Sequence, residues 1–209
     1  MADLVYRKVE ESDTDAIRNF LRENFYVDEP LNQSTGSNLP TEEQQEGPIS
    51  VIKHGSSTVA VDSQGNVAGV RLAYPKVPAD IKPPSQQIPT ANFDRMMDFL
   101  ALLGVRSEVF KKFNVDTSMH GMLLCVDKKY RGQGVGLKLY SENMKLAKSL
   151  GYPVYVCECT SLFSAKLCEK LEMTKVLEMN YNEYCDENGN AIFHKVPPHD
   201  MARVYVKVL

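Results

Sequence analysis

Long apolar runs and an excess of basic side chains are both missing from this sequence. No stretch reaches the roughly 18 consecutive apolar residues of a membrane-spanning helix, and residues 1–13 lack the apolar segment of a signal peptide. The formal net charge is −3, whereas a nucleic-acid-binding domain usually carries a basic patch or stripe. We therefore expect a cytoplasmic protein that binds neither membranes nor nucleic acid.

Paired cysteines and clustered metal ligands are missing as well. The five cysteines form no C-x-x-C pair, so neither a zinc ribbon nor a thioredoxin-type motif is indicated. No cluster of His, Cys and Asp residues has the spacing of metal ligands, and we predict that the protein holds no metal. Cys157 and Cys159 stand in an apolar segment, where thiols usually pack as small apolar groups.

The length and composition are typical of one globular domain. The chain has 209 residues, of which 43% are hydrophobic and 24% charged, and domains usually run to about 100–200 residues. The sequence has no internal repeat and no low-complexity tract. We predict a single domain over residues 1–209 and a monomer.

Strand-like and helix-like segments are interspersed along the chain. The patterns predict strands at 4–9, 57–62, 66–77, 119–126, 154–159, 176–181 and 203–208. They predict helices from Ser12 to about 24, over 93–103 and 109–113 with Gly104 between them, and over 135–150 and 161–171. A further short helix is expected after Thr41. Hairpins mixed with crossovers predict an α+β fold whose sheet contains both pairing senses.

The most specific motif is a glycine-rich turn, Arg131-Gly132-Gln133-Gly134-Val135-Gly136, between a predicted strand and a predicted helix. A helix N-terminus leaves backbone N–H groups without partners and carries a partial positive charge. Glycines let a phosphate approach that backbone closely. The P-loop and dinucleotide patterns do not fit, because Leu137 stands where the second pattern needs its third glycine. A tight turn without a ligand is the alternative.

This turn resembles the acetyl-CoA pyrophosphate loop of the GCN5-related N-acetyltransferases (GNAT superfamily). Arg131, Gly134 and Gly136 match the pattern Arg/Gln-x-x-Gly-x-Gly/Ala. The resemblance implies a twisted mixed sheet flanked by helices, in which two splayed strands hold acetyl-CoA as co-substrate. The residues that it implies for cofactor binding are Leu124, Cys125, Val126, Arg131, Gly132, Gln133, Gly134, Val135, Gly136, Ser161 and Ser164.

Three further segments resemble the insect arylalkylamine N-acetyltransferases. They are Asp28-Glu29-Pro30-Leu31-Asn32, the run from Cys159 to Ala165, and Pro197-Pro198-His199. The chain departs from that family at Glu172-Met173, where Gly-Phe is usual, and at Thr160, where serine is frequent. The resemblance implies acetylation of the primary amine of a small arylalkylamine of the dopamine, tyramine, octopamine or serotonin type. It also implies direct attack of the amine in a ternary complex.

Amide formation requires a base, because a protonated amine cannot attack a thioester. Glu29 is the candidate: Pro30 pushes it away from helical geometry into an extended loop. Neighbouring Phe25 and Tyr26 would desolvate the carboxyl and raise its pKa. The alternative is a solvated loop acid. With Glu29, Tyr26 and His199 are expected to line the amine site, although a structural role for His199 is an equal alternative.

Thr160 and Ser164 complete the expected catalytic set with Glu29. They are four residues apart and face the same way if the helix has begun at Thr160. Their hydroxyls could order water, bind the cofactor arm or hand a proton to the leaving thiolate. The alternative for Thr160 and Ser161 is that they only cap the helix.

Two other functions stay open. One is an acyltransferase for a different amine, such as a polyamine or a hydrazine, or for a longer acyl-CoA. The other is a CoA-binding protein of the same fold without turnover, against which the presence of Glu29, Thr160 and Ser164 counts.

Overall fold

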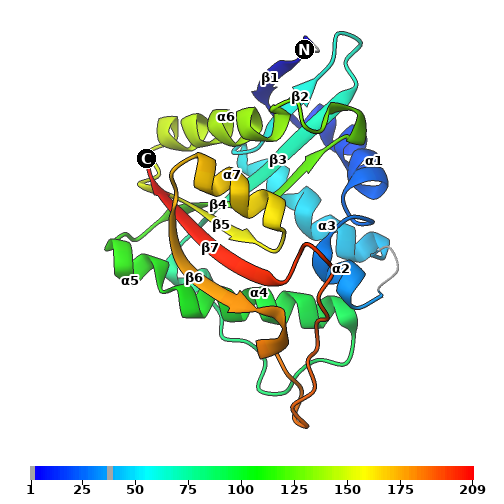
Figure 1. The fold of residues 1–209 in the computed structure, drawn as a ribbon. Helices are drawn as coiled ribbons and strands as arrows, with labels where there is room; N and C mark the ends of the chain where they lie inside the picture. Colours follow the sequence, from blue (N-terminus) through cyan, green and yellow to red (C-terminus); the bar gives the residue numbers. More distant parts are fainter. Residues whose placement is uncertain (1–2, 37–39) are drawn as a thin grey trace.

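One mixed sheet organises the computed structural model, which describes residues 3–36 and 40–209 (Figure 1). Within these residues seven strands follow the order β1-β2-β3-β4-β5-β7-β6. Their bounds are β1 Val5–Lys8, β2 Thr58–Val61, β3 Val67–Lys76, β4 Ser118–Val126, β5 Val154–Cys159, β6 Thr174–Asn180 and β7 Met201–Val208. β4 and β5 pair in parallel, whereas the other neighbouring strands pair antiparallel, so the predicted mixed sheet is confirmed.

Helices cover both faces of this sheet (Figure 1). Their bounds are α1 Thr14–Asn24, α2 Pro30–Ser34, α3 Glu42–Ser50, α4 Asn92–Ser107, α5 Val109–Phe113, α6 Val135–Ser149 and α7 Leu162–Lys170. In β5, Val154 and Val156 pack into the core with α4, while Tyr155 and Cys157 pack into the core with α6 and α7. Burial on both faces explains why β5 reads as an almost continuous apolar run.

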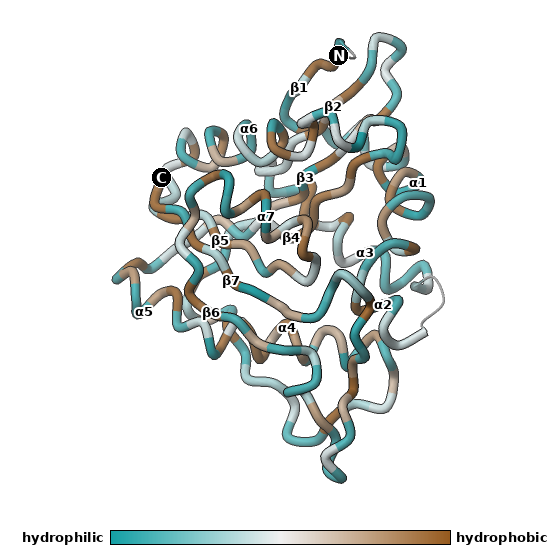
Figure 2. The backbone as a smooth tube through the Cα atoms, viewed as in Figure 1, coloured by the Kyte–Doolittle hydropathy of each residue, from teal (hydrophilic) through white to brown (hydrophobic). Residues whose placement is uncertain are grey.

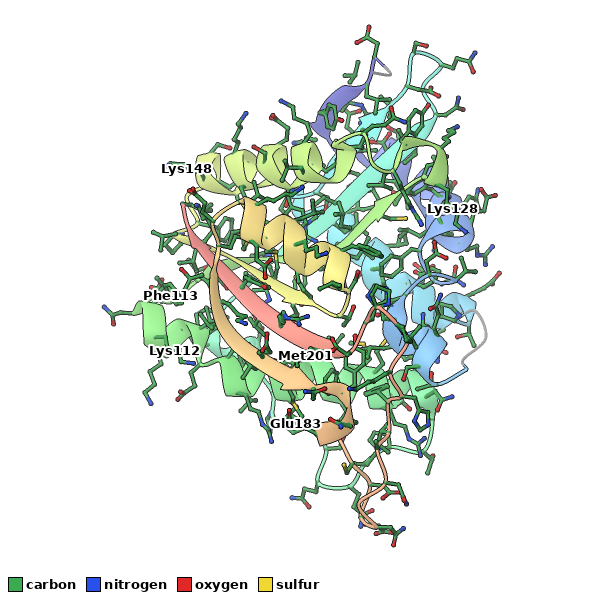
Figure 3. All side chains as sticks on the ribbon, in the orientation of Figure 1. Lys112, Phe113, Lys128, Lys148, Glu183 and Met201 are labelled. Atoms are coloured by element: carbon green, nitrogen blue, oxygen red, sulfur yellow. The ribbon has the colours of Figure 1, made fainter. Side chains whose placement is uncertain are left out.

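Apolar residues lie mainly inside, along the sheet, and charged residues lie mainly on the outside. Hydrophobic residues concentrate along β3 and β4 (Figure 2), and the exposed side chains of Lys112 and Lys148 lie toward one edge of the molecule (Figure 3). Among the described residues, no helix is both long enough and apolar enough to cross a membrane.

Two expected helix boundaries are wrong. Ser12 does not cap the first helix, because a 3-10 turn over Glu11–Asp13 precedes α1 and Asp13 accepts a hydrogen bond from the Glu10 amide (2.8 Å) instead. Gly104 does not separate two helices either. It lies inside α4, which ends at Glu108 in the left-handed conformation. One glycine costs a helix only about 1 kcal/mol, which the burial of its neighbour Leu103 offsets.

Candidate active site

The site begins where β4 and β5 stop pairing. Their parallel pairing covers Met119–Gly121 and Tyr155–Cys157, although β4 continues to Val126. On its other edge β4 pairs with β3, and there Met122 has no partner, since Leu72 pairs with Leu123 and Ala73 with Gly121. An extra residue of this kind bends a strand. The bend leaves the edge of β4 over 122–126 open toward a cavity.

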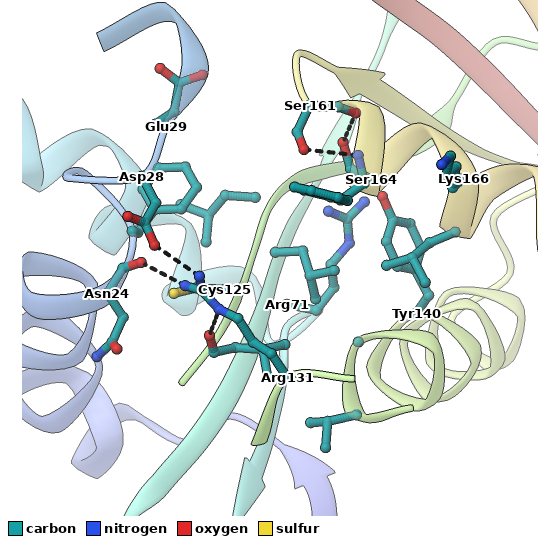
Figure 4. A pocket seen from close by; sticks show the side chains of 18 of the residues that line it. Asn24, Asp28, Glu29, Arg71, Cys125, Arg131, Tyr140, Ser161, Ser164 and Lys166 are labelled. Carbon is teal, nitrogen blue, oxygen red and sulfur yellow. Dashed lines mark hydrogen bonds and ion pairs between the residues drawn. The ribbon is translucent and has the colours of Figure 1, made fainter. Parts of the chain in front are cut away.

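A cavity of about 970 Å³ lies between the separating strands (Figure 4). We call the point where β4 and β5 separate, at Gly121 and Cys157, the fork. It brings together most of the residues expected from the sequence: Glu29, Leu124, Cys125, Val126, Arg131, Gly132, Gly134, Val135, Gly136, Thr160, Ser161, Ser164 and His199. Segments 131 residues apart, such as those of Glu29 and Thr160, thus meet in one hollow.

Two expected site residues lie outside this lining. Tyr26 is buried in the core between α1, α3 and the sheet, and burial raises its pKa to about 12. Phe25, which meets Tyr26 edge to face, lines the cavity in its place. The Gln133 side chain turns back and donates to the Lys129 carbonyl (2.9 Å). Neither side chain lines the cavity, and the roles of Tyr26 in amine binding and of Gln133 in cofactor binding stay predictions.

The glycine turn has the backbone geometry that an anion site needs. Gly132 and Gly134 have φ values of 74° and 82°, a region that glycine enters without steric cost. A Cβ on Gly136 would meet Leu167 Cδ1 at 3.3 Å, so this glycine lets α6 approach α7 closely. The N-terminal amides of α6 consequently open at the cavity, beside Lys128 and Arg131. This donor set fits the diphosphate of a coenzyme A molecule.

Arg131 is already engaged within the protein. Its Nη1 forms an ion pair with Asp28 Oδ2 (2.9 Å), and its Nε donates to the Val126 carbonyl (2.9 Å). These contacts tie the loop that carries Glu29 to the end of β4 (Figure 4). Phosphate binding by the Arg131 side chain stays a prediction, and it would have to compete with or share this ion pair.

Glu29 is a buried carboxyl with two donors. It has the expected extended backbone (φ −72°, ψ 124°), but the following Pro30 opens α2, so Glu29 is the N-cap of a helix rather than a residue of an open loop. Its Oε2 accepts from the Asn32 amide (2.7 Å) and its Oε1 from Thr160 Oγ1 (3.0 Å). Burial raises the pKa of Glu29 and outweighs the lowering effect of these hydrogen bonds.

The helix has not begun at Thr160, so the condition for a shared helix face of Thr160 and Ser164 is not met. α7 begins at Leu162, and Ser161 caps it by accepting from the Phe163 amide (3.1 Å). Thr160 lies before the helix and contacts Glu29, whereas Ser164 Oγ donates to the Ser161 carbonyl (2.9 Å). The two hydroxyls still line the same cavity, from a strand end and a helix respectively.

His199 combines a structural contact with a place in the cavity wall. Its Nδ1 accepts from the Leu162 amide at the start of α7 (3.1 Å), and its ring meets Phe163 edge to face. Burial lowers the pKa of His199, which favours the neutral ring. A neutral ring that accepts at Nδ1 carries its proton on Nε2.

Among the polar residues of the cavity wall that sequence reasoning missed are Arg71, Tyr140 and Glu158. A charged residue inside an apolar strand is the signal for two of them, since Arg71 stands between Val70 and Leu72 and Glu158 between Cys157 and Cys159. His120 Nδ1 lies 4.0 Å from Glu158 Oε1, and burial holds the pKa of His120 well below its usual value.

Across residues 3–36 and 40–209, no group of three or more His, Cys, Asp or Glu is arranged to hold a metal ion.

Comparison with known proteins places this geometry in a family. No family model matches the chain, but solved structures match nearly all of it. A mosquito arylalkylamine N-acetyltransferase like 5b is 27% identical with a TM-score of 0.89, covering 99% of this chain and 100% of that one. Arylalkylamine N-acetyltransferase 2 from Aedes aegypti is 26% identical with a TM-score of 0.89, covering 99% of each chain.

A third similar structure has a different stated substrate. It is a Drosophila melanogaster polyamine N-acetyltransferase that catalyses the formation of N-acetylagmatine, 25% identical with a TM-score of 0.90, covering 99% of this chain and 100% of that one. All three share the fold of this chain, and its seven-stranded mixed sheet flanked by helices matches the expected GNAT fold. The chain belongs to the GNAT superfamily and, within it, is similar to insect arylalkylamine and polyamine N-acetyltransferases.

Proposed function

We propose that this protein is an acetyl-CoA-dependent N-acetyltransferase that acetylates the primary amine of a small arylalkylamine. The observation that carries the proposal is one cavity that joins the open edge of β4, the glycine turn of α6 and the buried carboxyl of Glu29. An anion site, a backbone edge and a base are the three parts that this reaction asks of a protein.

Glu29 acts as the base in this proposal. The incoming ammonium must lose a proton before its nitrogen can attack, and a carboxyl with a raised pKa accepts that proton more readily than an ordinary one. Hydrogen bonds from Asn32 and Thr160 fix the carboxyl oxygens. The proton passes to Glu29 directly or through one water.

Acetyl-CoA, when bound, supplies the thioester that is attacked. The α6 amides and Arg131 hold its diphosphate, and the unpaired edge of β4 over 122–126 binds its extended arm. Ser161 and Ser164 border the same space from the start of α7. Holding both reactants in one cavity supports direct attack of the amine, because orientation alone supplies much of the rate of such a transfer.

The walls of the cavity support an arylalkylamine. Phe25, Met122 and Phe163 offer apolar and aromatic surface, and the carboxyl of Glu29 attracts the ammonium. Aromatic rings pack well against such walls.

Glu158 favours a second candidate, a diamine or guanidinium amine. It is a second carboxyl in the cavity wall. The neutral His120 lies 4.0 Å from it, and the charge of Lys76 acts on it without a direct ion pair. A substrate with a second cation would pair with it. The polyamine N-acetyltransferase among the similar structures is consistent with this alternative.

A thiol-release assay over a panel of amines tests the function and separates the two candidates. Phenylethylamines, indolylethylamines, agmatine and diamines are compared by kcat/KM with acetyl-CoA, and the best amine is repeated with longer acyl-CoA. An arylalkylamine should have the highest kcat/KM. Preference for agmatine or a diamine that Glu158→Gln abolishes would select the second candidate. Binding of acetyl-CoA without turnover of any amine would contradict both.

A further inference from the structure

Arg71 is a buried cation in the wall of the cavity. It stands in β3, next to β4 in the sheet, is 2% exposed and lines the cavity. A Cβ on Gly121 would lie 1.7 Å from Arg71 Nη2, so the glycine in β4 makes the space for the guanidinium. Gly121 and Cys157 are the last paired residues of β4 and β5. The guanidinium therefore lies at the fork itself (Figure 4).

The surroundings of Arg71 contain no matching negative charge. Its Nε donates to Tyr155 Oη (3.0 Å), its Nη2 donates to Cys157 Sγ (2.9 Å), and its guanidinium carbon lies 4.1 Å from the centre of the Tyr140 ring. In the part of the chain that the structure describes, no carboxylate forms an ion pair with it. An unpaired buried charge is expensive, and such a cost is typical of functional sites.

The charge stays on Arg71 in this environment. Burial opposes it, but Tyr140, Tyr155 and Cys157 more than compensate, and the pKa of Arg71 stays well above its ordinary value. The cavity thus has a permanent cation in a region shielded from water, where its field is weakly screened.

The course of β4 shows which end of a bound coenzyme A would meet this cation. From the fork at Gly121, the open edge over 122–126 leads to the glycine turn at 131–136. A molecule whose diphosphate sits at the turn and whose arm follows this edge has its sulfur end at the fork. This placement rests on the proposed function.

We propose that Arg71 stabilises the thiolate sulfur of coenzyme A after the acetyl group has left. In the transfer, a bond forms between the amine nitrogen and the acetyl carbon, and the carbon–sulfur bond breaks with its electron pair on sulfur. Two protons leave the nitrogen: the ammonium gives one to Glu29 before the attack, and the nitrogen gives the other to solvent water as the intermediate collapses. The sulfur takes neither proton, so coenzyme A leaves as a thiolate. The thioester sulfur carries no charge, so Arg71 favours the product over the starting thioester. Negative charge already develops on the sulfur in the transition state as the carbon–sulfur bond breaks, and stabilising it there accelerates the reaction.

Cys157 is the competing partner for this charge. Burial raises the pKa of its thiol, but Cys168, Arg71 and Tyr140 together have the larger, opposite effect. The pKa of Cys157 is therefore lower than that of an ordinary thiol. If Cys157 ionised, its own thiolate would neutralise Arg71, and the cavity would not distinguish charged from uncharged sulfur. A binding experiment decides between the two partners without any catalysis.

Calorimetric titration of the whole protein with coenzyme A, with acetyl-CoA and with the S-methyl thioether of coenzyme A tests the proposal. The thiol of free coenzyme A should have a pKa of about 8.5, like an ordinary thiol. If Arg71 lowers the pKa of the bound thiol, the affinity for coenzyme A relative to acetyl-CoA rises with pH and levels off above that value. We expect a rise of about tenfold between pH 6.5 and 9.5, and no rise for the thioether.

A wild-type ratio that does not change with pH would overturn the proposal, whether or not any variant folds. Arg71→Met should remove the rise and Arg71→Lys should keep part of it, provided circular dichroism shows both to be folded. Retention of the full rise in folded Arg71→Met would also overturn it. Failure of the wild-type protein to bind any of the three ligands would instead refute the proposed function, and this inference with it.

Discussion

The glycine turn of α6 and the fork between β4 and β5 lie at the two ends of the same strand edge, but they are built differently. The turn uses contiguous residues, 131–136, and offers mostly backbone amides in a partly exposed setting. The fork uses side chains from distant segments, such as the buried Arg71 and Tyr140 and the half-buried Glu158. A backbone site tolerates side-chain change except at its glycines, whereas a side-chain site depends on each charge and on the packing around it.

Substitutions at the two ends should therefore change different kinetic quantities. Changes at the turn should weaken coenzyme A binding and leave the chemical step nearly intact. Changes near the fork and at Glu29 should slow the chemical step and leave acetyl-CoA affinity nearly intact. The predictions below test this separation, beginning with the largest expected effect.

Glu29→Gln should lower kcat by about 10²–10⁴-fold, the usual contribution of a general base, with acetyl-CoA affinity little changed. Burial raises the pKa of Glu29, so wild-type activity should rise as pH increases through that raised pKa, where the carboxyl becomes ionised. The variant should lack this acidic limb. Steady-state kinetics at several pH values measure both effects.

Two results would contradict the assignment of Glu29 as the base. Retention of wild-type kcat with the same pH profile would transfer that role to a water chain or another carboxyl. A rise in KM for the amine at constant kcat would show that Glu29 only binds the ammonium.

Gly134→Val should weaken acetyl-CoA binding by about 100-fold while the fold survives. Gly134 has φ 82° and precedes the first residue of α6, and a left-handed conformation costs a non-glycine residue about 1–2 kcal/mol. The branched side chain would also stand where the diphosphate approaches the backbone. Calorimetric titration measures the affinity, and kcat at saturating acetyl-CoA serves as the internal control. Unchanged affinity in a folded variant would remove the anion site from this turn.

The contrast between the two ends also explains what the sequence could and could not predict. The turn was predictable because its meaning is local: a strand, glycines at fixed positions and a helix. The need for glycine at position 121 was not predictable. It comes from the guanidinium of Arg71, 50 residues away in the sequence, which would collide with any Cβ at that position. Most strands were predicted within two residues, since burial on one or two faces leaves a clear pattern.

Helix starts and side-chain directions were the weaker predictions. Ser12 and Asp13 are both plausible caps by type, and Arg7 helps to decide the outcome by binding Asp13 (2.6 Å). Tyr26 and Phe25 are both aromatic neighbours of Glu29, and only the packing of α1 against α3 decides that Tyr26 enters the core. Pro30 excluded a helical Glu29 correctly, but the same proline is also well suited to open a helix.

Arg131→Ala should have the smallest of these effects, about a tenfold loss of acetyl-CoA affinity. A hydrogen bond to a charged group contributes about 1.5–3 kcal/mol, but a phosphate would compete for Arg131 with its ion pair to Asp28. The loss should therefore fall at the lower end of that range. It should shrink for a pantetheine analogue without phosphates. Gln133→Ala is the matched control, because that side chain points away from the cavity and its loss should change affinity less than twofold.

An equal loss of affinity for the phosphate-free analogue would mean that Arg131 acts through the loop it holds rather than through phosphate. Asp28→Asn distinguishes the two roles, since it breaks the same ion pair and leaves the guanidinium in place. If Arg131 binds phosphate, Asp28→Asn should preserve or strengthen acetyl-CoA binding. If Arg131 only anchors the loop, Asp28→Asn should reproduce the Arg131→Ala defect and raise KM for the amine, because the same loop carries Glu29. In that case the two ends of the cavity are coupled through one ion pair.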